Sequence, residues 1–188
     1  MITVKEYLEL CGKPCPLSKE DLDKLLEYNN WLMTEYPFLI PHDRCDDEII
    51  DNTCSDGRTY TELDDLPNGW RMVFGNDICK ELKDELIKFN CLDKYRIVQI
   101  KEKFGTLRWY DYGYPAECKV RDIIRKYEEM SEKICIECGK PAKWITKGWI
   151  NFICDDCAEK QLKKYNQKNT KKHYTKNELF GKIYTERT

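Results

Sequence analysis

The sequence predicts an α+β fold, in which helices pack on a small antiparallel β-hairpin or sheet and a cysteine-rich module follows near the C-terminus. Three observations predict it: apolar residues recur at helical spacing in several segments, two β-rich segments flank a short stretch with Gly105, and two CxxC pairs follow residue 134. With 188 residues, 41% of them hydrophobic, the chain can form one domain with its own core and a small appended module.

Two helices are expected in the N-terminal part of the chain. The first runs from near Thr3 to Gly12, because a glycine followed closely by Pro14 is a common way to end a helix. Ser18, with an aspartate three residues later, is a capping signal for the second helix. Apolar residues at helical spacing then continue until the proline at position 37, which ends the pattern.

The middle of the chain predicts a hairpin between two further helices. One helix starts near Asn76 and places its apolar residues on one face. Residues 95–100 and 106–110 are rich in β-forming side chains and are separated by a short stretch, which predicts a β-hairpin. The next helix starts at Pro115 and keeps its apolar period to residue 134, where it leads into the first CxxC pair.

Charge and composition divide the chain into four parts. We expect an N-terminal helical region with an acidic loop (1–68), an α+β core (69–134), a four-cysteine module (135–160) and a basic C-terminal tail (161–188). Nine acids against two arginines make residues 42–66 acidic, whereas lysines dominate after residue 157. Such a tail can contact phosphates or form a solvated helix end and a loose terminus, and both interpretations stay open.

Composition also bears on the compartment. Charged residues make up 35% of the chain, the mean hydropathy is −0.74, and no apolar run approaches the length of a membrane span. The first residues lack the profile of a signal peptide, so we expect a soluble cytoplasmic protein with no membrane partner. In that reducing compartment eleven cysteines, an odd number, are not expected to form disulfides.

The strongest chemical signal is CIEC at 135–138 followed, after fifteen residues, by CDDC at 154–157. Two CxxC pairs at this separation are typical of a structural zinc site with four thiolates, and Gly139 tolerates the positive φ that such a knuckle needs. Knuckle, short hairpin and following helix together predict a treble-clef or zinc-ribbon-like module. Four buried cysteines without a metal, a redox CxxC and an iron site remain alternatives. The predicted ligands are Cys135, Cys138, Cys154 and Cys157.

The other seven cysteines carry weaker signals. The CGKP at residues 11–14 repeats the sequence at 138–141 but lacks a preceding partner cysteine, so it is not a second knuckle. A second metal site with irregular spacing stays open; its candidate ligands are Cys11, Cys15, Cys45, Cys54 and His42. Small buried residues are the expected role of Cys79, Cys91 and Cys118.

The predicted hairpin is the candidate ligand-binding element, because it collects cations and flat rings. Rings can stack on a nucleobase, while lysine and arginine can neutralise phosphates. In the alternative interpretation, strand alternation sends Phe104, Leu107 and Trp109 into the core and leaves the charges in solvent. The candidate binding residues are Lys101, Lys103, Arg108, Trp109, Tyr110 and Tyr112.

Catalysis is not expected. His42 and His173 are the only two histidines and lie in no recognisable catalytic motif, and the chain has neither a P-loop nor GxGxxG. Clustered acids such as Asp46, Asp47 and Asp51 could hold magnesium, but an acidic loop is usually only a solvated loop.

Several of these motifs occur together in a known group of proteins. Gly69-Trp70, an amphipathic helix, KEKFGTLRWY, another helix and ICIECGKPA ending in ICDDC resemble a broad set of small, mostly uncharacterised bacteriophage and prophage proteins. The resemblance covers residues 69–157. It implies a viral or mobile-element origin and a cytoplasmic setting in an infected bacterium, but no settled activity and no catalytic residues.

These observations favour a non-catalytic binding protein that sequesters a nucleotide or a nucleotide-derived host defence signal on the hairpin. The alternatives are a zinc-containing protein that binds nucleic acid or regulates the host, and a protein–protein interaction module that uses Trp144 and Trp149. Salt distinguishes the first two, because contacts to many phosphates of a polymer weaken steeply as salt rises.

Overall fold

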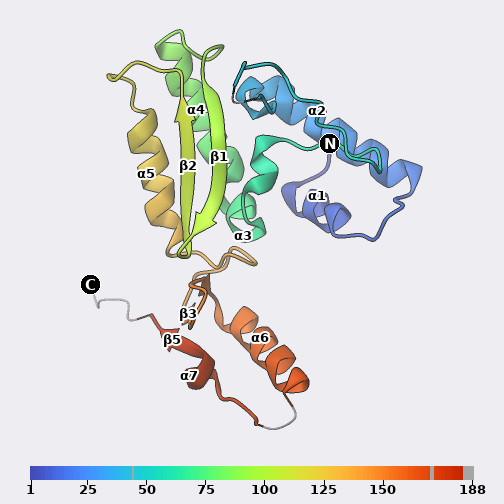
Figure 1. Ribbon diagram of the computed structural model, residues 1–188, viewed down its shortest axis with the longest axis vertical. Helices are drawn as coiled ribbons and strands as arrows, with labels where there is room; N and C mark the ends of the chain where they lie inside the picture. Colours follow the sequence, from blue (N-terminus) through green and yellow to red (C-terminus); the bar gives the residue numbers. More distant parts are fainter. Residues whose placement is uncertain (44, 170–171, 184–188) are drawn as a thin grey trace.

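The protein has the expected α+β fold, built as two packed parts (Figure 1). The computed structural model describes residues 1–43, 45–169 and 172–183. The larger part holds the N-terminal helices, a two-stranded hairpin and the helices beside it, around one core; the smaller part holds the four cysteines, with a small cluster of its own. No helix in the described ranges is long and apolar enough to cross a membrane.

The two N-terminal helices begin and end where the sequence predicts. α1 (Val4–Cys11) is capped by Thr3, whose side chain accepts a hydrogen bond from the Glu6 backbone, and it ends at Gly12. In α2 (Lys19–Glu35) the cap is Ser18, and a single 3₁₀ turn, η1 (Pro37–Leu39), follows. Both helices bury apolar side chains in the main core.

The third predicted helix starts earlier than expected. After the 3₁₀ turn η2 (Glu62–Asp65), one continuous helical run consists of α3 (Asn68–Trp70), a π-helical turn labelled η3 (Arg71–Gly75) and α4 (Asn76–Lys88). Gly69 within α3 and Gly75 at the end of the π-helical turn disfavour a helix in isolation, so the sequence predicts only α4. Tertiary packing overrides this preference, because Trp70 and Phe74 are buried.

Arg71, in the π-helical turn, joins this run to the N-terminal helices. Its guanidinium is buried, forms an ion pair with Asp64, and lies 4.5 Å from the centre of the Tyr7 ring on α1. A buried charge needs such partners because leaving water is costly. Arg71 therefore fixes α1 and η2 against the helix.

The β-hairpin is confirmed. β1 (Arg96–Lys103) and β2 (Thr106–Tyr112) pair antiparallel, and a register shift lies between Ile97 and Gln99. α5 (Val120–Ser131) packs on β2 and α4; it begins five residues after Pro115, which instead opens a turn. Strand alternation buries Leu107 and Trp109 on the helix-covered face.

The cysteine module has a second sheet. β3 (Trp144–Thr146) pairs antiparallel with β4 (Phe152–Ile153) on one side and with β5 (Phe180–Lys182) on the other. α6 (Asp155–Lys168) and α7 (Lys176–Leu179) complete it. β5 lies in the segment expected to be a basic tail, so the sheet of the module extends beyond residue 160. Of that predicted tail, residues 170–171 and 184–188 lie outside the described residues.

The two parts meet backbone to backbone. The tip of the β1–β2 hairpin points toward the module (Figure 1), and Gly105 lies against the Phe152 ring. On the helix side, the Gly69 N–H donates to the Ile136 carbonyl at 2.8 Å, and a Cβ added at Gly69 would lie 2.1 Å from the Cys135 carbonyl oxygen. Only glycine fits there. The motifs that the sequence singles out, at 69–70, 101–110 and 134–142, thus converge on one junction.

Candidate metal centre and hairpin surface

The first cysteine pair forms the predicted knuckle. Residues 135–139 turn back on themselves, with the Gly139 N–H donating to the Cys135 carbonyl at 2.9 Å and the Cys135 N–H donating to the Lys140 carbonyl at 2.7 Å. Gly139 has φ 76°, the left-handed conformation that the sequence predicts for it. The knuckle brings the sulfurs of Cys135 and Cys138 to the same side.

The second pair is placed by the start of α6. Cys154 is the N-cap residue and Cys157 lies in the first turn, so the helix geometry directs both side chains to one end. Asp155 accepts a hydrogen bond from the Trp144 indole at 2.6 Å and lies 2.9 Å from the Lys143 ammonium. These contacts hold the helix start against β3, and acids in a first helical turn also complement the helix dipole.

The four sulfurs come together in one cluster. They all lie within 4.8 Å of one another, and the Cys138 and Cys154 sulfurs are 3.5 Å apart. Tetrahedral coordination with metal–sulfur bonds of about 2.3 Å requires sulfur separations of about 3.8 Å. Three of the thiols are buried and Cys138 is half-buried. The cluster could therefore hold a metal ion with small adjustments of the side chains.

Burial opposes ionisation of two of the four thiols. Burial raises the pKa of Cys135, although backbone N–H groups of Cys154, Cys138 and Glu137 oppose the effect. Burial also raises the pKa of Cys157. Four thiolates this close would repel one another, and a metal ion bound by them removes that repulsion. A four-sulfur shell leaves no open coordination position for a substrate.

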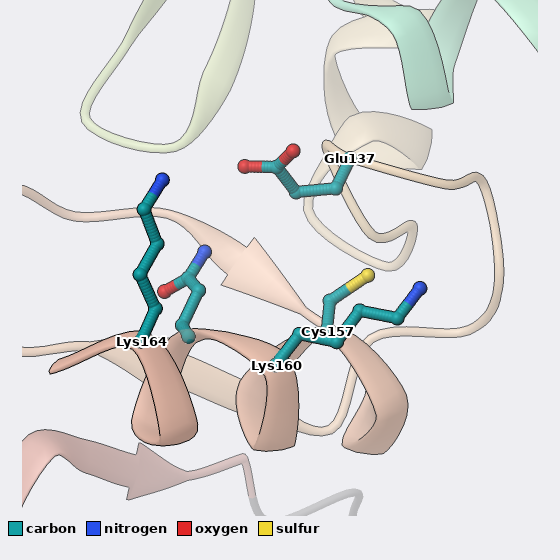
Figure 2. Close-up of a pocket in the computed structure, with 5 residues that line it drawn as sticks. Glu137, Cys157, Lys160 and Lys164 are labelled. Carbon is teal, nitrogen blue, oxygen red and sulfur yellow. The ribbon is translucent and has the colours of Figure 1, made fainter. Parts of the chain in front are cut away.

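A pocket of about 430 Å³ opens beside this cluster. Figure 2 shows Cys157 and Lys164 rising from α6 toward the side on which Glu137 lies. Lys160 and Lys164 are exposed, and neither has an ion pair among the described residues. Apart from the sulfur of a predicted metal ligand, the pocket is lined by ordinary polar side chains.

The remaining cysteines form no second cluster. Among residues 1–43, 45–169 and 172–183, only the C-terminal group brings three or more histidine, cysteine or acidic ligands within metal-binding distance. Cys15 instead donates to Asp56 at 2.9 Å, and Arg58 approaches the same sulfur at 3.5 Å. Cys79, Cys91 and Cys118 are buried as predicted.

The six predicted binding residues do not form one surface. Trp109 is only 2% exposed and its indole N–H donates to the Tyr95 hydroxyl at 2.9 Å, so its ring faces the core and offers no stacking surface. Tyr112 is exposed but lies at the far end of the hairpin, 3.3 Å from Asp47. The alternative based on strand alternation holds for Leu107 and Trp109 but not for Phe104, which is 66% exposed.

Three of the six residues do gather on the other face of the hairpin. Lys101 lies directly opposite Arg108, and Tyr110 is the next residue on that face of β2. The Lys101 ammonium is 5.1 Å from the centre of the Tyr110 ring, which is 42% exposed. The exposed Lys103 ammonium lies 5.6 Å from the Phe104 ring, nearer the hairpin tip. We call Lys101, Arg108 and Tyr110 the hairpin face.

The sequence predicted no binding role for Phe104, and it indicated a role for Trp149 only in contacts with another protein. Trp149 is 75% exposed on the loop between β3 and β4, and its indole N–H donates to Glu102 of the hairpin at 3.2 Å. The signal available in the sequence was a Phe-Gly pair at a hairpin tip, where polar residues are usual.

The two histidines differ in their surroundings. The Nδ1 atom of His42 lies 2.6 Å from the Ile40 carbonyl oxygen, and His173 is exposed without a hydrogen bond or ion pair in the described part of the chain.

Comparison of the chain with protein-family models, curated proteins and solved structures found no significant match. The candidate function therefore rests on the geometry.

Proposed function

We propose that the four-cysteine cluster holds one structural zinc ion. Soft thiolates in a tetrahedral set favour zinc, and the order of knuckle, hairpin and helix is that of a treble-clef module. Metal analysis of the purified full-length protein should find about one equivalent of zinc per chain. Replacing Cys135 and Cys154 by serine should abolish it, while a Cys91→Ser control should retain it. A folded wild-type protein without metal, or one that carries iron, would overturn the assignment.

We further propose that the protein is a non-catalytic binding protein for nucleotides, with the hairpin face as the binding surface. The observation that carries the proposal is the placement of Lys101 directly opposite Arg108, next to the exposed Tyr110 ring. Like charges at directly opposed positions destabilise a β-hairpin, so folding does not explain this pair. A bound phosphate would remove the repulsion, and the tyrosine offers a surface on which a base can stack.

The neighbouring groups leave this charge available. Lys101 donates to Gln99 at 2.5 Å and has no ion pair within the described ranges. The guanidinium of Arg108 donates to the Leu107 carbonyl at 2.7 Å and lies 4.0 Å from Glu128, its nearest acid. These partners orient the two cations but neutralise them only weakly. In the cytoplasm of an infected bacterium, such a face would sequester a nucleotide-derived signal without breaking a bond.

Nucleotide binding can be tested by titrating a fluorescent nucleoside triphosphate into the full-length protein and recording anisotropy. A Lys101→Gln/Arg108→Gln variant should bind about 100-fold more weakly or worse, because charge-assisted hydrogen bonds contribute about 1.5–3 kcal/mol each and the variant removes two of them. The matched control is Lys5→Gln/Arg125→Gln, which removes the same charge from exposed helix positions and should bind like the wild type. Equal affinities for the two double variants, or no binding by the wild type, would contradict the proposal.

A further inference from the structure

Two exposed aromatic rings lie where the main part and the cysteine module meet. Phe104, at the tip of the β1–β2 hairpin, and Trp149, on the β3–β4 loop, are 66% and 75% exposed. They line a pocket of about 280 Å³ together with Lys103 and Ile150. This is below the usual range of about 300–1,000 Å³ for drug-sized ligands, so the pocket has room for a single ring system.

The backbone at Phe104 is unfavourable for a phenylalanine. Phe104 and Gly105 form a two-residue turn with φ 56° and 80°, the left-handed pair of a type I′ hairpin. Asparagine is favoured at the first of these positions, whereas a bulky side chain is an outlier there. Because the ring stays exposed, burial does not compensate for this conformation. A strained residue with an exposed ring points to a role in binding rather than in folding.

Trp149 is held in position before any ligand arrives. One carboxylate oxygen of Glu102 accepts from the Trp149 indole N–H at 3.2 Å, and the other accepts from the Gly105 backbone N–H at 2.6 Å. Glu102 thus fixes the indole to the same turn that presents Phe104. Rings held in this way lose little conformational entropy on binding.

The charge around the rings selects an anionic partner. Lys103 is exposed beside Phe104 and has no ion pair in the described part of the chain, whereas the carboxylate of Glu102 is already hydrogen-bonded. Flat rings bordered by a free cation recognise bases linked by phosphates. A protein partner without acidic side chains would gain from the apolar rings but not from the unpaired lysine.

We propose that Phe104 and Trp149 are stacking positions for the bases of a single-stranded nucleic acid whose backbone continues along the hairpin face. The proposal rests on nucleotide binding at that face and extends the ligand from a single nucleotide to a polymer of nucleotides. Tyr110 lies about five residues from the hairpin tip, or roughly 17 Å along the strand at about 3.3 Å per residue. One nucleotide is too short to contact both places, but an extended strand can do so.

The test compares fluorescein-labelled oligothymidylate of about twelve nucleotides, within the site size of about 4–16 nucleotides common for such proteins, with thymidine triphosphate. Affinities of the full-length protein are measured by anisotropy at low salt and again at higher salt. Phe104→Asn and Trp149→Ala should each weaken oligonucleotide binding about 5- to 150-fold, since stacking contributes about 1–3 kcal/mol per base. Their affinity for the triphosphate should not change. The control is Phe89→Ala, which removes an exposed ring at the end of α4.

The outcomes separate the two proposals. If Lys101→Gln/Arg108→Gln weakens binding of both probes while the ring variants bind the oligonucleotide like the wild type, the stacking positions are wrong and nucleotide binding stands. If the wild type binds neither probe, both proposals fail. If the wild type binds neither probe and sediments as a dimer, while the Phe104→Asn variant sediments as a monomer, the rings contact a second copy of the chain instead.

Discussion

At the scale of single residues, a half-buried carboxylate on β2 links two tyrosines that flank the hairpin. Asp111 on β2 accepts hydrogen bonds from Tyr95 at 2.7 Å and from Tyr114 at 3.1 Å. Burial raises the pKa of Asp111, and the two tyrosine hydroxyls oppose the effect only in part. The folded protein therefore holds a proton on Asp111 more tightly than the unfolded chain does.

This pKa shift predicts a pH dependence of stability. The contribution of Asp111 to the free energy of unfolding should fall as pH rises from the ordinary carboxyl pKa through the raised one. Asp111→Asn cannot ionise, so its stability relative to wild type should improve in urea unfolding as pH rises above the ordinary carboxyl pKa of about 4. Asp47→Asn should show the opposite trend below the ordinary carboxyl pKa, losing stability relative to wild type as pH rises, because a hydrogen bond from Arg96 lowers the pKa of Asp47. Parallel trends in the two variants would refute this account.

At the scale of elements, the tip of the first hairpin conflicts with local preference. The turn needs left-handed φ at both central residues, and phenylalanine occupies the first. We expect Phe104→Asn to raise the free energy of unfolding by about 0.5–1 kcal/mol, because a left-handed conformation costs most L-residues about 1–2 kcal/mol and asparagine less. Urea unfolding measures it. The control Phe104→Leu removes the ring but keeps a bulky side chain in the left-handed conformation. A gain in stability in this control would show that the backbone conformation is not the cause.

The sequence predicted those elements whose signal is local. Capping at Ser18 and apolar periodicity gave α2, and β-forming residues around Gly105 gave the hairpin. Short strands such as β5 carry no period and form only because β3 offers a free edge, so they could not be predicted. The two CxxC pairs were sufficient to predict the cysteine cluster, because ligand spacing is itself local.

The surface of the hairpin was predicted less well, because it depends on contacts that are not local in sequence. Alternation shows that Trp109 and Tyr110 point to opposite faces of β2, but not which face the helices cover. α5 packs on β2 and buries the face of the strand that carries Trp109. This contact joins two separate elements, so the strand sequence alone does not predict it. Phe104 belongs to the main part and Trp149 to the cysteine module, and the two residues line the same pocket. Their proximity depends on how the two parts pack together, so no short stretch of the sequence predicts it.

At the scale of the whole molecule, the junction at Gly69 is the point at which the two parts constrain each other. Gly69→Ala should lower the free energy of unfolding by about 1–3 kcal/mol, since the new methyl group must displace the backbone of Cys135. Gly12→Ala is the matched control, because Gly12 has helical φ and an added carbon would lie 3.6 Å from its nearest neighbours, an ordinary contact distance. It should be neutral or slightly stabilising. Thermal unfolding of both variants gives the comparison, and equal midpoints would show that the junction can relax.

The two stacking rings belong to different parts of the molecule, which has a consequence for the metal. Phe104 is fixed by the main core, whereas Trp149 lies on a loop between two strands of the module that the cysteine cluster anchors. A nucleic-acid strand that stacks on both rings would favour the metal-loaded arrangement of the two parts. Thermodynamic reciprocity then requires that the metal and the nucleic acid change each other's affinity by the same factor. Whatever factor the metal adds to the affinity for nucleic acid, nucleic acid adds to the affinity for the metal. A chelator should therefore remove the ion less readily from the complex than from the free protein.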